Sequence, residues 1–220
     1  MKALHAALLA AGLAALVPLR AAGCDLALLL AIDISGSVDD GEYQLQVEGT
    51  AKALEYPEVA AALLNAEVAL SVVQWSSVGM QKLVQPWRRM ESAAALAAFA
   101  RAARAQERAF GKADTAVGDA LAFSVAQFAT VPDCRRRVID ISGDGVQNAG
   151  GALAPSRALA IRAGISINAI AIEGMGLTIS EFYRRNVITK GGFVVTATGH
   201  TDYPRVLRMK ILREVARPMG

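Results

Sequence analysis

One short stretch constrains the fold more than any other, because an apolar run there ends abruptly in a polar loop. Residues 26–32 read Leu-Ala-Leu-Leu-Leu-Ala-Ile, and Asp33-Ile34-Ser35-Gly36-Ser37 follows directly. A short apolar run bounded by turn residues is typical of a strand buried on both faces of a parallel sheet. In an open α/β sheet, ligands bind where the strands end. The pattern therefore predicts a parallel sheet with a binding site at this loop.

The polar residues of the loop alternate, so a tight turn directs their oxygens toward one point. Asp33 supplies a carboxylate, and Ser35 and Ser37 supply hydroxyls. These are hard oxygen ligands, which suit Mg²⁺, Mn²⁺ or Ca²⁺ and suit zinc poorly. We therefore expect a divalent cation at the end of the first strand.

The first 23 residues have the features of an export signal. Lys2 gives a short positive start, residues 3–19 are largely apolar, and Ala21-Ala22-Gly23 supplies small residues for cleavage. The apolar stretch is short for a bilayer span. The prediction is a signal peptide over 1–23 and one mature domain over 24–220, without a transmembrane span, in the periplasm or outside the cell. The alternative is an uncleaved N-terminal anchor.

Removal of this leader lowers the net charge of the chain. The chain has 23 Lys and Arg and 20 Asp and Glu, a formal net charge of +3. The leader holds two basic residues, Lys2 and Arg20, and no acidic ones, so the mature chain carries 21 − 20 = +1. A nearly neutral domain gives no reason to expect a nucleic-acid partner.

The two cysteines are predicted to pair. Cys24 lies nine residues before Asp33, and Cys134 lies ten before Asp144, which ends a second apolar strand. If the strands are parallel neighbours, the offset is one residue, about 3.3 Å, which permits a disulfide. An exported protein would hold such a pair oxidised. The alternative is a lipid anchor on Cys24, which would exclude the disulfide; Ala21 stands where a lipidation signal favours leucine.

Strands and helices alternate along the chain, which predicts a doubly wound α/β domain with a mostly parallel six-stranded sheet. Pro86 places one short strand at an antiparallel edge. The expected strands are 26–33, 68–75, 82–87, 137–142, 165–172 and 193–198. The expected helices are 39–54, 92–106, 117–128, 155–163, 180–188 and 202–216.

Two further segments add polar residues to those of the first loop. Thr115 stands just before a predicted helix, and Asp144 ends the second central strand between Gly143 and Gly145. Together with the Asp-x-Ser-x-Ser loop, these residues make the chain resemble the von Willebrand factor A (vWA) domain. The five positions that match the metal-ion-dependent adhesion site (MIDAS) of that family are Asp33, Ser35, Ser37, Thr115 and Asp144.

The resemblance implies a function. It is closest to a bacterial group of exported vWA-like proteins without a settled activity, through the segments Leu30–Asp39 and Arg136–Gly145. It implies a divalent metal, with Mg²⁺ preferred over Mn²⁺ and Ca²⁺. The metal would be held directly by the three hydroxyls and directly or through water by the two aspartates. A protein or peptide partner would supply an acidic side chain to the metal, in an adhesion, scaffolding or assembly role rather than in catalysis.

The enzyme alternative is a Mg²⁺-dependent phosphohydrolase of the haloacid dehalogenase type. Such proteins resemble this one in a first-strand aspartate and a later Gly-Asp-Gly. They need a second aspartate two residues after the first as a general acid, and Ser35 stands there. The acid usual after their Gly-Asp-Gly loop is replaced by Asn148. The sequence therefore favours a binding module.

Other polar residues have simpler interpretations. The acids near the loop are expected at helix N-termini, where the helix dipole favours them; they are Asp39, Asp40, Glu42 and Asp119. Asp140 is expected to be buried and structural, and Trp75 to pack in the core. His200 is assigned to a loop. The basic residues of the last helix are expected to form a solvated face; they are Arg205, Arg208, Lys210, Arg213 and Arg217.

Overall fold

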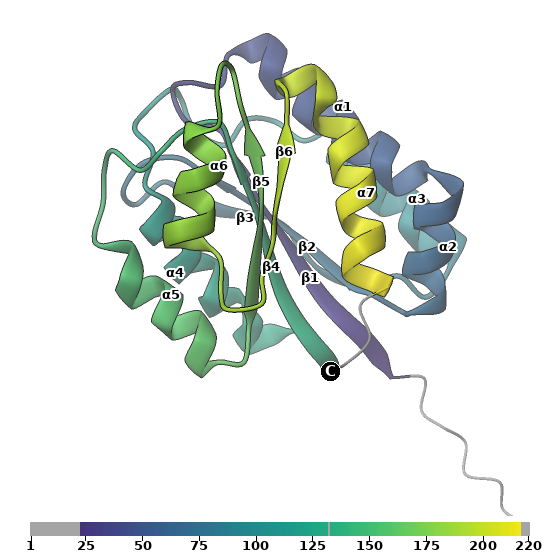
Figure 1. The fold of residues 1–220 in the computed structure, drawn as a ribbon. Helices are drawn as coiled ribbons and strands as arrows, with labels where there is room; N and C mark the ends of the chain where they lie inside the picture. Colours follow the sequence, from purple (N-terminus) through teal and green to yellow (C-terminus); the bar gives the residue numbers. More distant parts are fainter. Residues whose placement is uncertain (1–22, 132, 217–220) are drawn as a thin grey trace, which may run out of the picture.

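A six-stranded sheet in the order β3-β2-β1-β4-β5-β6 forms the centre of the molecule (Figure 1). The structure is a computed structural model that describes residues 23–131 and 133–216. The strands are β1 (Cys24–Asp33), β2 (Ala69–Trp75), β3 (Gln81–Arg89), β4 (Cys134–Gly143), β5 (Ser166–Ile172) and β6 (Val194–Ala197). Only β3 runs antiparallel to its neighbour, as predicted for an edge strand. The predicted doubly wound α/β fold is thereby confirmed.

Helices cover both faces of the sheet. The helices are α1 (Asp40–Glu55), α2 (Pro57–Asn65), α3 (Ala93–Arg104), α4 (Val117–Gln127), α5 (Leu153–Arg162), α6 (Thr178–Phe182) and α7 (Tyr203–Ala216). Short 3₁₀ turns lie at Phe128–Thr130 and His200–Asp202, and a π turn extends α6 over Tyr183–Val187. Buried residues of α1, α2, α3 and α7 pack on one face, and those of α4, α5 and α6 with its π turn on the other.

Successive side chains of β1 contribute alternately to the hydrophobic clusters on the two faces of the sheet. Leu26, Leu28 and Leu30 belong to one buried cluster, and Ala27 and Leu29 belong to the other. Successive side chains of a strand point to opposite faces, so an uninterrupted apolar run is what a strand between two helical layers requires. This explains why the run preceding the polar loop is apolar at every position.

The sequence did not predict α2, because the first helix was expected to end at Leu54 and nothing was assigned before Val68. The structure places Pro57 at the first turn of α2, where its missing N–H costs no hydrogen bond. In the predicted helix 180–188, a π turn replaces regular α-helix from Tyr183 onward. Neither difference moves a residue of the predicted metal site.

A disulfide joins Cys24 and Cys134 at the edge of the sheet opposite the polar loops, as predicted. The two residues are direct partners in the β1–β4 register, and their Cα atoms are 4.5 Å apart. The expected one-residue offset is therefore wrong at this edge. The register ends at the other edge with Ile32 paired to Ser142. Asp33 follows Ile32 directly, whereas Asp144 lies two residues after Ser142, so the one-residue difference falls at the edge with the polar loops.

The last helix departs from the expected solvated basic face at Lys210, whereas Arg205 and Arg213 are exposed. Lys210 is fully buried, and its Nζ lies 2.6 Å from Asp140 Oδ1 and 3.1 Å from Glu214 Oε1. The guanidinium of Arg213 stacks over Phe193 at 3.8 Å from the ring centroid. Arg217 and the leader, except Gly23, lie outside the described residues. None of the helices within 23–131 and 133–216 is both long and apolar enough to cross a membrane.

Candidate metal centre

The loop after β1 turns three oxygen-bearing side chains toward one another. Asp33 Oδ1 accepts a hydrogen bond from the Ser35 backbone N–H at 2.7 Å, which fixes the carboxylate at the end of the strand. The hydroxyls of Ser35 and Ser37 lie 3.1 Å apart. Gly36 donates its N–H to the Ala113 carbonyl at 2.6 Å, and a Cβ on Gly36 would lie 3.0 Å from the same oxygen. Glycine therefore lets this loop press against the segment that carries Thr115.

The two remaining predicted residues reach the same point from other loops. Thr115 precedes α4 and donates its hydroxyl to Ser35 Oγ at 3.2 Å. Asp144 follows β4 and accepts the Ser37 hydroxyl at 2.5 Å through Oδ1. The parallel pairing of β1 with β4 brings both aspartates to one edge of the sheet. The structure thus gathers all five residues predicted from the sequence.

Burial makes the first carboxylate unusual. Asp33 is fully buried, and its Oδ2 has no hydrogen-bond partner among the described residues. Burial, and then the charge of Asp144, raises the pKa of Asp33 to about 7. Burial likewise raises the pKa of Asp144, while the Ser37 hydroxyl opposes that rise. Asp33 is fully buried and Asp144 partly buried, and neither forms an ion pair with a lysine or arginine among the described residues. A divalent ion would stabilise this electrostatic arrangement.

The space around this carboxylate explains the first glycine of the Gly-Asp-Gly segment, Gly143. A Cβ on Gly143 would lie 2.8 Å from Asp33 Oδ2 and would collide with the Tyr183 hydroxyl. The fully buried Tyr183 hydroxyl has no hydrogen-bond partner among the described residues. Burial, followed by the charge of Asp33, holds the pKa of Tyr183 well above its usual range, so the phenol is neutral.

Supporting residues that the sequence did not reveal hold the loops in place. Arg108 uses one terminal nitrogen to donate to the carbonyls of Ile34 at 2.7 Å, Ser35 at 3.0 Å and Val38 at 2.9 Å. Asn148 accepts the backbone N–H of Thr115 through its side-chain oxygen at 2.8 Å. Asn148 stands four residues after Asp144, which was a usable signal, whereas the isolated Arg108 offered none.

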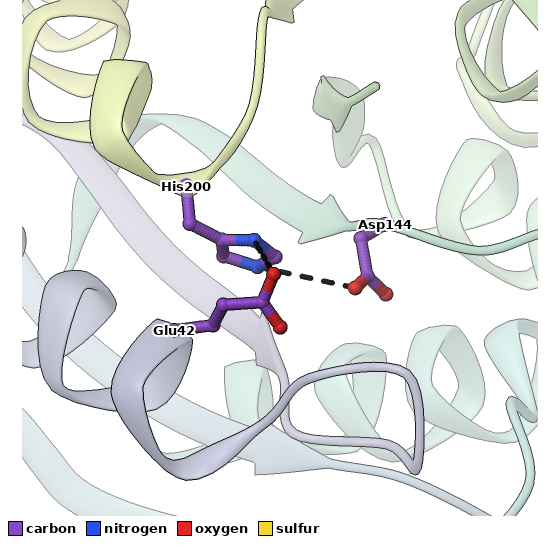
Figure 2. Close-up of side chains that lie close together, drawn as sticks. All are labelled: Glu42, Asp144 and His200. Carbon is purple, nitrogen blue, oxygen red and sulfur yellow. Dashed lines mark ion pairs between the residues drawn. The ribbon is translucent and has the colours of Figure 1, made fainter. Parts of the chain in front are cut away.

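A histidine beside the site corrects one sequence interpretation. His200 was assigned to a loop, but its side chain is only 5% exposed. Its ring lies between Glu42 and Asp144 (Figure 2), with Nδ1 3.1 Å from Glu42 Oε1 and Nε2 4.0 Å from Asp144 Oδ2. Glu42 also forms the expected helix-terminal contact, a reciprocal capping box with Asp39.

The surface around the centre is partly apolar. Four exposed apolar side chains lie in loops that follow the carboxyl ends of β2, β4 and β5, the same edge that carries the polar cluster; they are Val78, Val146, Met175 and Leu177. Met175 is 97% exposed. Trp75, by contrast, is fully buried and packs in the core as predicted.

Comparisons with solved structures give the class of protein. The chain is similar to proximal thread matrix protein 1 from the mussel byssus, with a TM-score of 0.62 and 19% identity over 87% of this chain and 48% of that one. It is similar to a von Willebrand factor type A protein from Catenulispora acidiphila, with a TM-score of 0.61 and 19% identity over 90% and 43% of the two chains.

A third similar structure is the pilus adhesin SpaC from Lactobacillus rhamnosus GG, with a TM-score of 0.64 and 13% identity over 87% of this chain and 30% of that one. One structure of the mussel protein has a zinc-occupied MIDAS motif. The chain therefore spans about half, or less, of the length of these relatives. A search of curated proteins finds no match.

The sheet order, the helical layers and the solved relatives define a vWA-type domain with a Rossmann-like fold. Within that class the assignment is specific. A family model described as "Protein of unknown function (DUF1194)" matches residues 23–219, and the chain belongs to this family.

Proposed function

We propose that this protein binds a divalent cation through Asp33, Ser35, Ser37, Thr115 and Asp144, and through that cation an acidic side chain of a protein or peptide. The observation that carries the proposal is the convergence of three hydroxyls and two carboxylates at one edge of the sheet. The buried Oδ2 of Asp33, without a described partner, fits an added cation. Mg²⁺ is the expected ion, with Mn²⁺ and Ca²⁺ as alternatives.

The ligand set explains why an acidic partner is expected. Hydroxyls are neutral, weakly donating ligands, and one oxygen from each of the five residues falls short of the roughly six oxygens that Mg²⁺ prefers. A glutamate or aspartate from a partner fills the open position with a strongly donating oxygen. The exposed apolar side chains on the same edge, including Met175 and Leu177, provide contact area around that ionic anchor.

We place this binding outside the cytoplasm, in an adhesion, scaffolding or assembly role. The Cys24–Cys134 disulfide is typical of proteins from oxidising compartments, and the predicted leader over 1–23 agrees with export. A disulfide-bonded Cys24 has no thiol to acylate, so the lipid-anchor alternative and the bond exclude one another. Two proteins of similar fold are described as a thread matrix protein of the mussel byssus and as a pilus adhesin, which supports such a role.

Calorimetric titration of Mg²⁺, Mn²⁺ and Ca²⁺ tests the cation. We expect binding that the double variant Ser35→Ala/Ser37→Ala loses and the control Ser77→Ala retains, because Ser77 lies in the separate loop between β2 and β3. Glutamate-containing peptides should then bind in Mg²⁺ and not in a chelator. Robust hydrolysis of an aryl phosphate that Asp33→Asn abolishes would instead favour the phosphohydrolase alternative.

A further inference from the structure

The histidine beside the centre has two chemically different neighbours. Glu42 Oε2 accepts the Asp39 backbone N–H at 2.8 Å, so the carboxylate is fixed with its other oxygen facing His200 Nδ1. The 3.1 Å between Nδ1 and this carboxylate oxygen is short enough for Nδ1 to donate its proton to the carboxylate. In a neutral imidazole that places the hydrogen on Nδ1 and leaves the lone pair on Nε2.

The second ring nitrogen is the unusual one. Nε2 of His200 is buried and has no hydrogen-bond partner among the described residues. It faces Asp144 Oδ2 at 4.0 Å, too far for a hydrogen bond. A buried nitrogen with a free lone pair, aimed at a carboxylate oxygen, is unfavourable unless something positive lies between the two atoms.

The two carboxylate oxygens of Asp144 face different groups. Its Oδ1 accepts the Ser37 hydroxyl and belongs to the hydroxyl-lined centre, whereas Oδ2 faces His200. One ligand atom from each of Glu42, Asp144 and His200 lies within 4.8 Å of the others. His200 Nε2 and Asp144 Oδ2 are 4.0 Å apart, so an ion with ligands at about 2.0–2.2 Å fits between these two atoms.

We propose that His200 Nε2 and Asp144 Oδ2 bind a second cation, a transition-metal ion of the Zn²⁺ class, next to the hydroxyl-lined centre and sharing Asp144 with it. Glu42 acts as a positioning residue, since ligating histidines typically donate the other ring N–H to a carboxylate. Imidazole nitrogen favours Zn²⁺, Co²⁺ or Ni²⁺ over Mg²⁺ and Ca²⁺. The inference goes beyond the proposed partner binding and does not depend on it.

The alternative is a protonated imidazole that bridges two carboxylates as an ion pair, and ¹⁵N-histidine NMR separates the two. His200 is the single histidine of the sequence between residues 24 and 220, so the mature domain gives one histidine signal, and His200→Gln confirms its assignment. Zn²⁺ added in saturating Mg²⁺ should shift the Nε2 resonance of His200. A His200 signal of a doubly protonated ring that Zn²⁺ leaves unchanged would overturn the proposal.

Calorimetry in saturating Mg²⁺ tests the separation of the two sites. We expect one Zn²⁺ ion per chain, lost in His200→Gln and retained in the control Ser77→Ala. Glu42→Ala should weaken Zn²⁺ binding about 10–100-fold, and Glu42→Gln, which still accepts the Nδ1 proton, should restore most of it. Ser35→Ala/Ser37→Ala should lose Mg²⁺ and keep Zn²⁺. Loss of Zn²⁺ in that serine variant, or unchanged Zn²⁺ binding in His200→Gln, would overturn a separate site.

These readouts also keep this inference apart from the proposed function. If Mg²⁺ binding fails while the Zn²⁺ response of His200 is present, only the hydroxyl-lined centre is refuted. If Mg²⁺ binds and His200 does not respond, only the second site is refuted.

Discussion

Arg108 donates to the backbone carbonyl of Ser35 at 3.0 Å, across 73 residues of sequence. The same nitrogen contacts two other carbonyls of the loop, so this one cation holds the loop in its turned conformation. Hydrogen bonds to charged groups contribute about 1.5–3 kcal/mol each to stability. Arg108→Met should lower the free energy of unfolding by about 2–3 kcal/mol and weaken Mg²⁺ binding.

Urea denaturation and Mg²⁺ titration measure both effects. Arg101→Met is the matched control, because Arg101 is exposed on α3, and it should change neither quantity appreciably. Wild-type Mg²⁺ affinity in Arg108→Met would contradict a role in positioning the loop.

The disulfide should be a major source of stability. It closes a loop across 110 residues between Cys24 and Cys134, and such a long loop loses much entropy when it is cross-linked in the unfolded chain. The double variant Cys24→Ser/Cys134→Ser should lose about 2–5 kcal/mol of unfolding free energy.

Reductant provides the internal control for this prediction. It should lower the urea midpoint of the wild type toward that of the double serine variant and leave the variant itself unchanged. A wild type whose midpoint does not respond to reductant, with thiols that react before reduction, would show that the bond is absent in solution.

The sequence predicted the residues of the candidate metal centre because most of them lie at strand ends or in the loops that follow. Asp33, Ser35 and Asp144 each follow an apolar strand or share its loop, so a local pattern places them at one edge. Arg108 and His200 carry no such pattern, since their positions result from the packing of loops far apart in sequence. Lys210 was misassigned for a different reason. It lies on the buried stripe of α7 with Val206 and Ile211, but its charge indicated solvent, because its partner Asp140 lies far away in the sequence, in β4.

The buried Lys210 should be essential to stability. Its Nζ lies between Asp140 and Glu214, and Lys210→Met would leave two buried carboxylates without this cation. Removal of one member of a buried ionic group costs about 3–5 kcal/mol. The exposed Lys52, 64% accessible, provides the control Lys52→Met, which should stay near wild type.

The deficit of Lys210→Met should depend on pH in a defined direction. Burial raises the pKa of Asp140 to about 6, above its ordinary value of 3.8. Protonation of Asp140 therefore favours the folded state, and this contribution is lost as pH rises through about 6. Chemical denaturation should show a larger deficit at pH 8 than at pH 5; a deficit that grows toward acid would refute this assignment.

The last prediction concerns Asp33, whose pKa of about 7 lies far above its ordinary 3.8. Without a cation, its protonation favours folding at low pH, and that contribution is lost as pH rises through 7. A cation must displace the proton, so Mg²⁺ affinity should rise by about tenfold per pH unit below the pKa and level off above it. Titrations at pH 6, 7 and 8, in buffers of different ionisation enthalpy, measure both the affinity and the proton released.

Asp33→Asn, which carries no titrating carboxylate at this position, should bind Mg²⁺ weakly and lose this proton release. A wild type with pH-independent affinity and no proton release would mean that Asp33 is already ionised, and that its buried carboxylate is stabilised by something other than the bound cation.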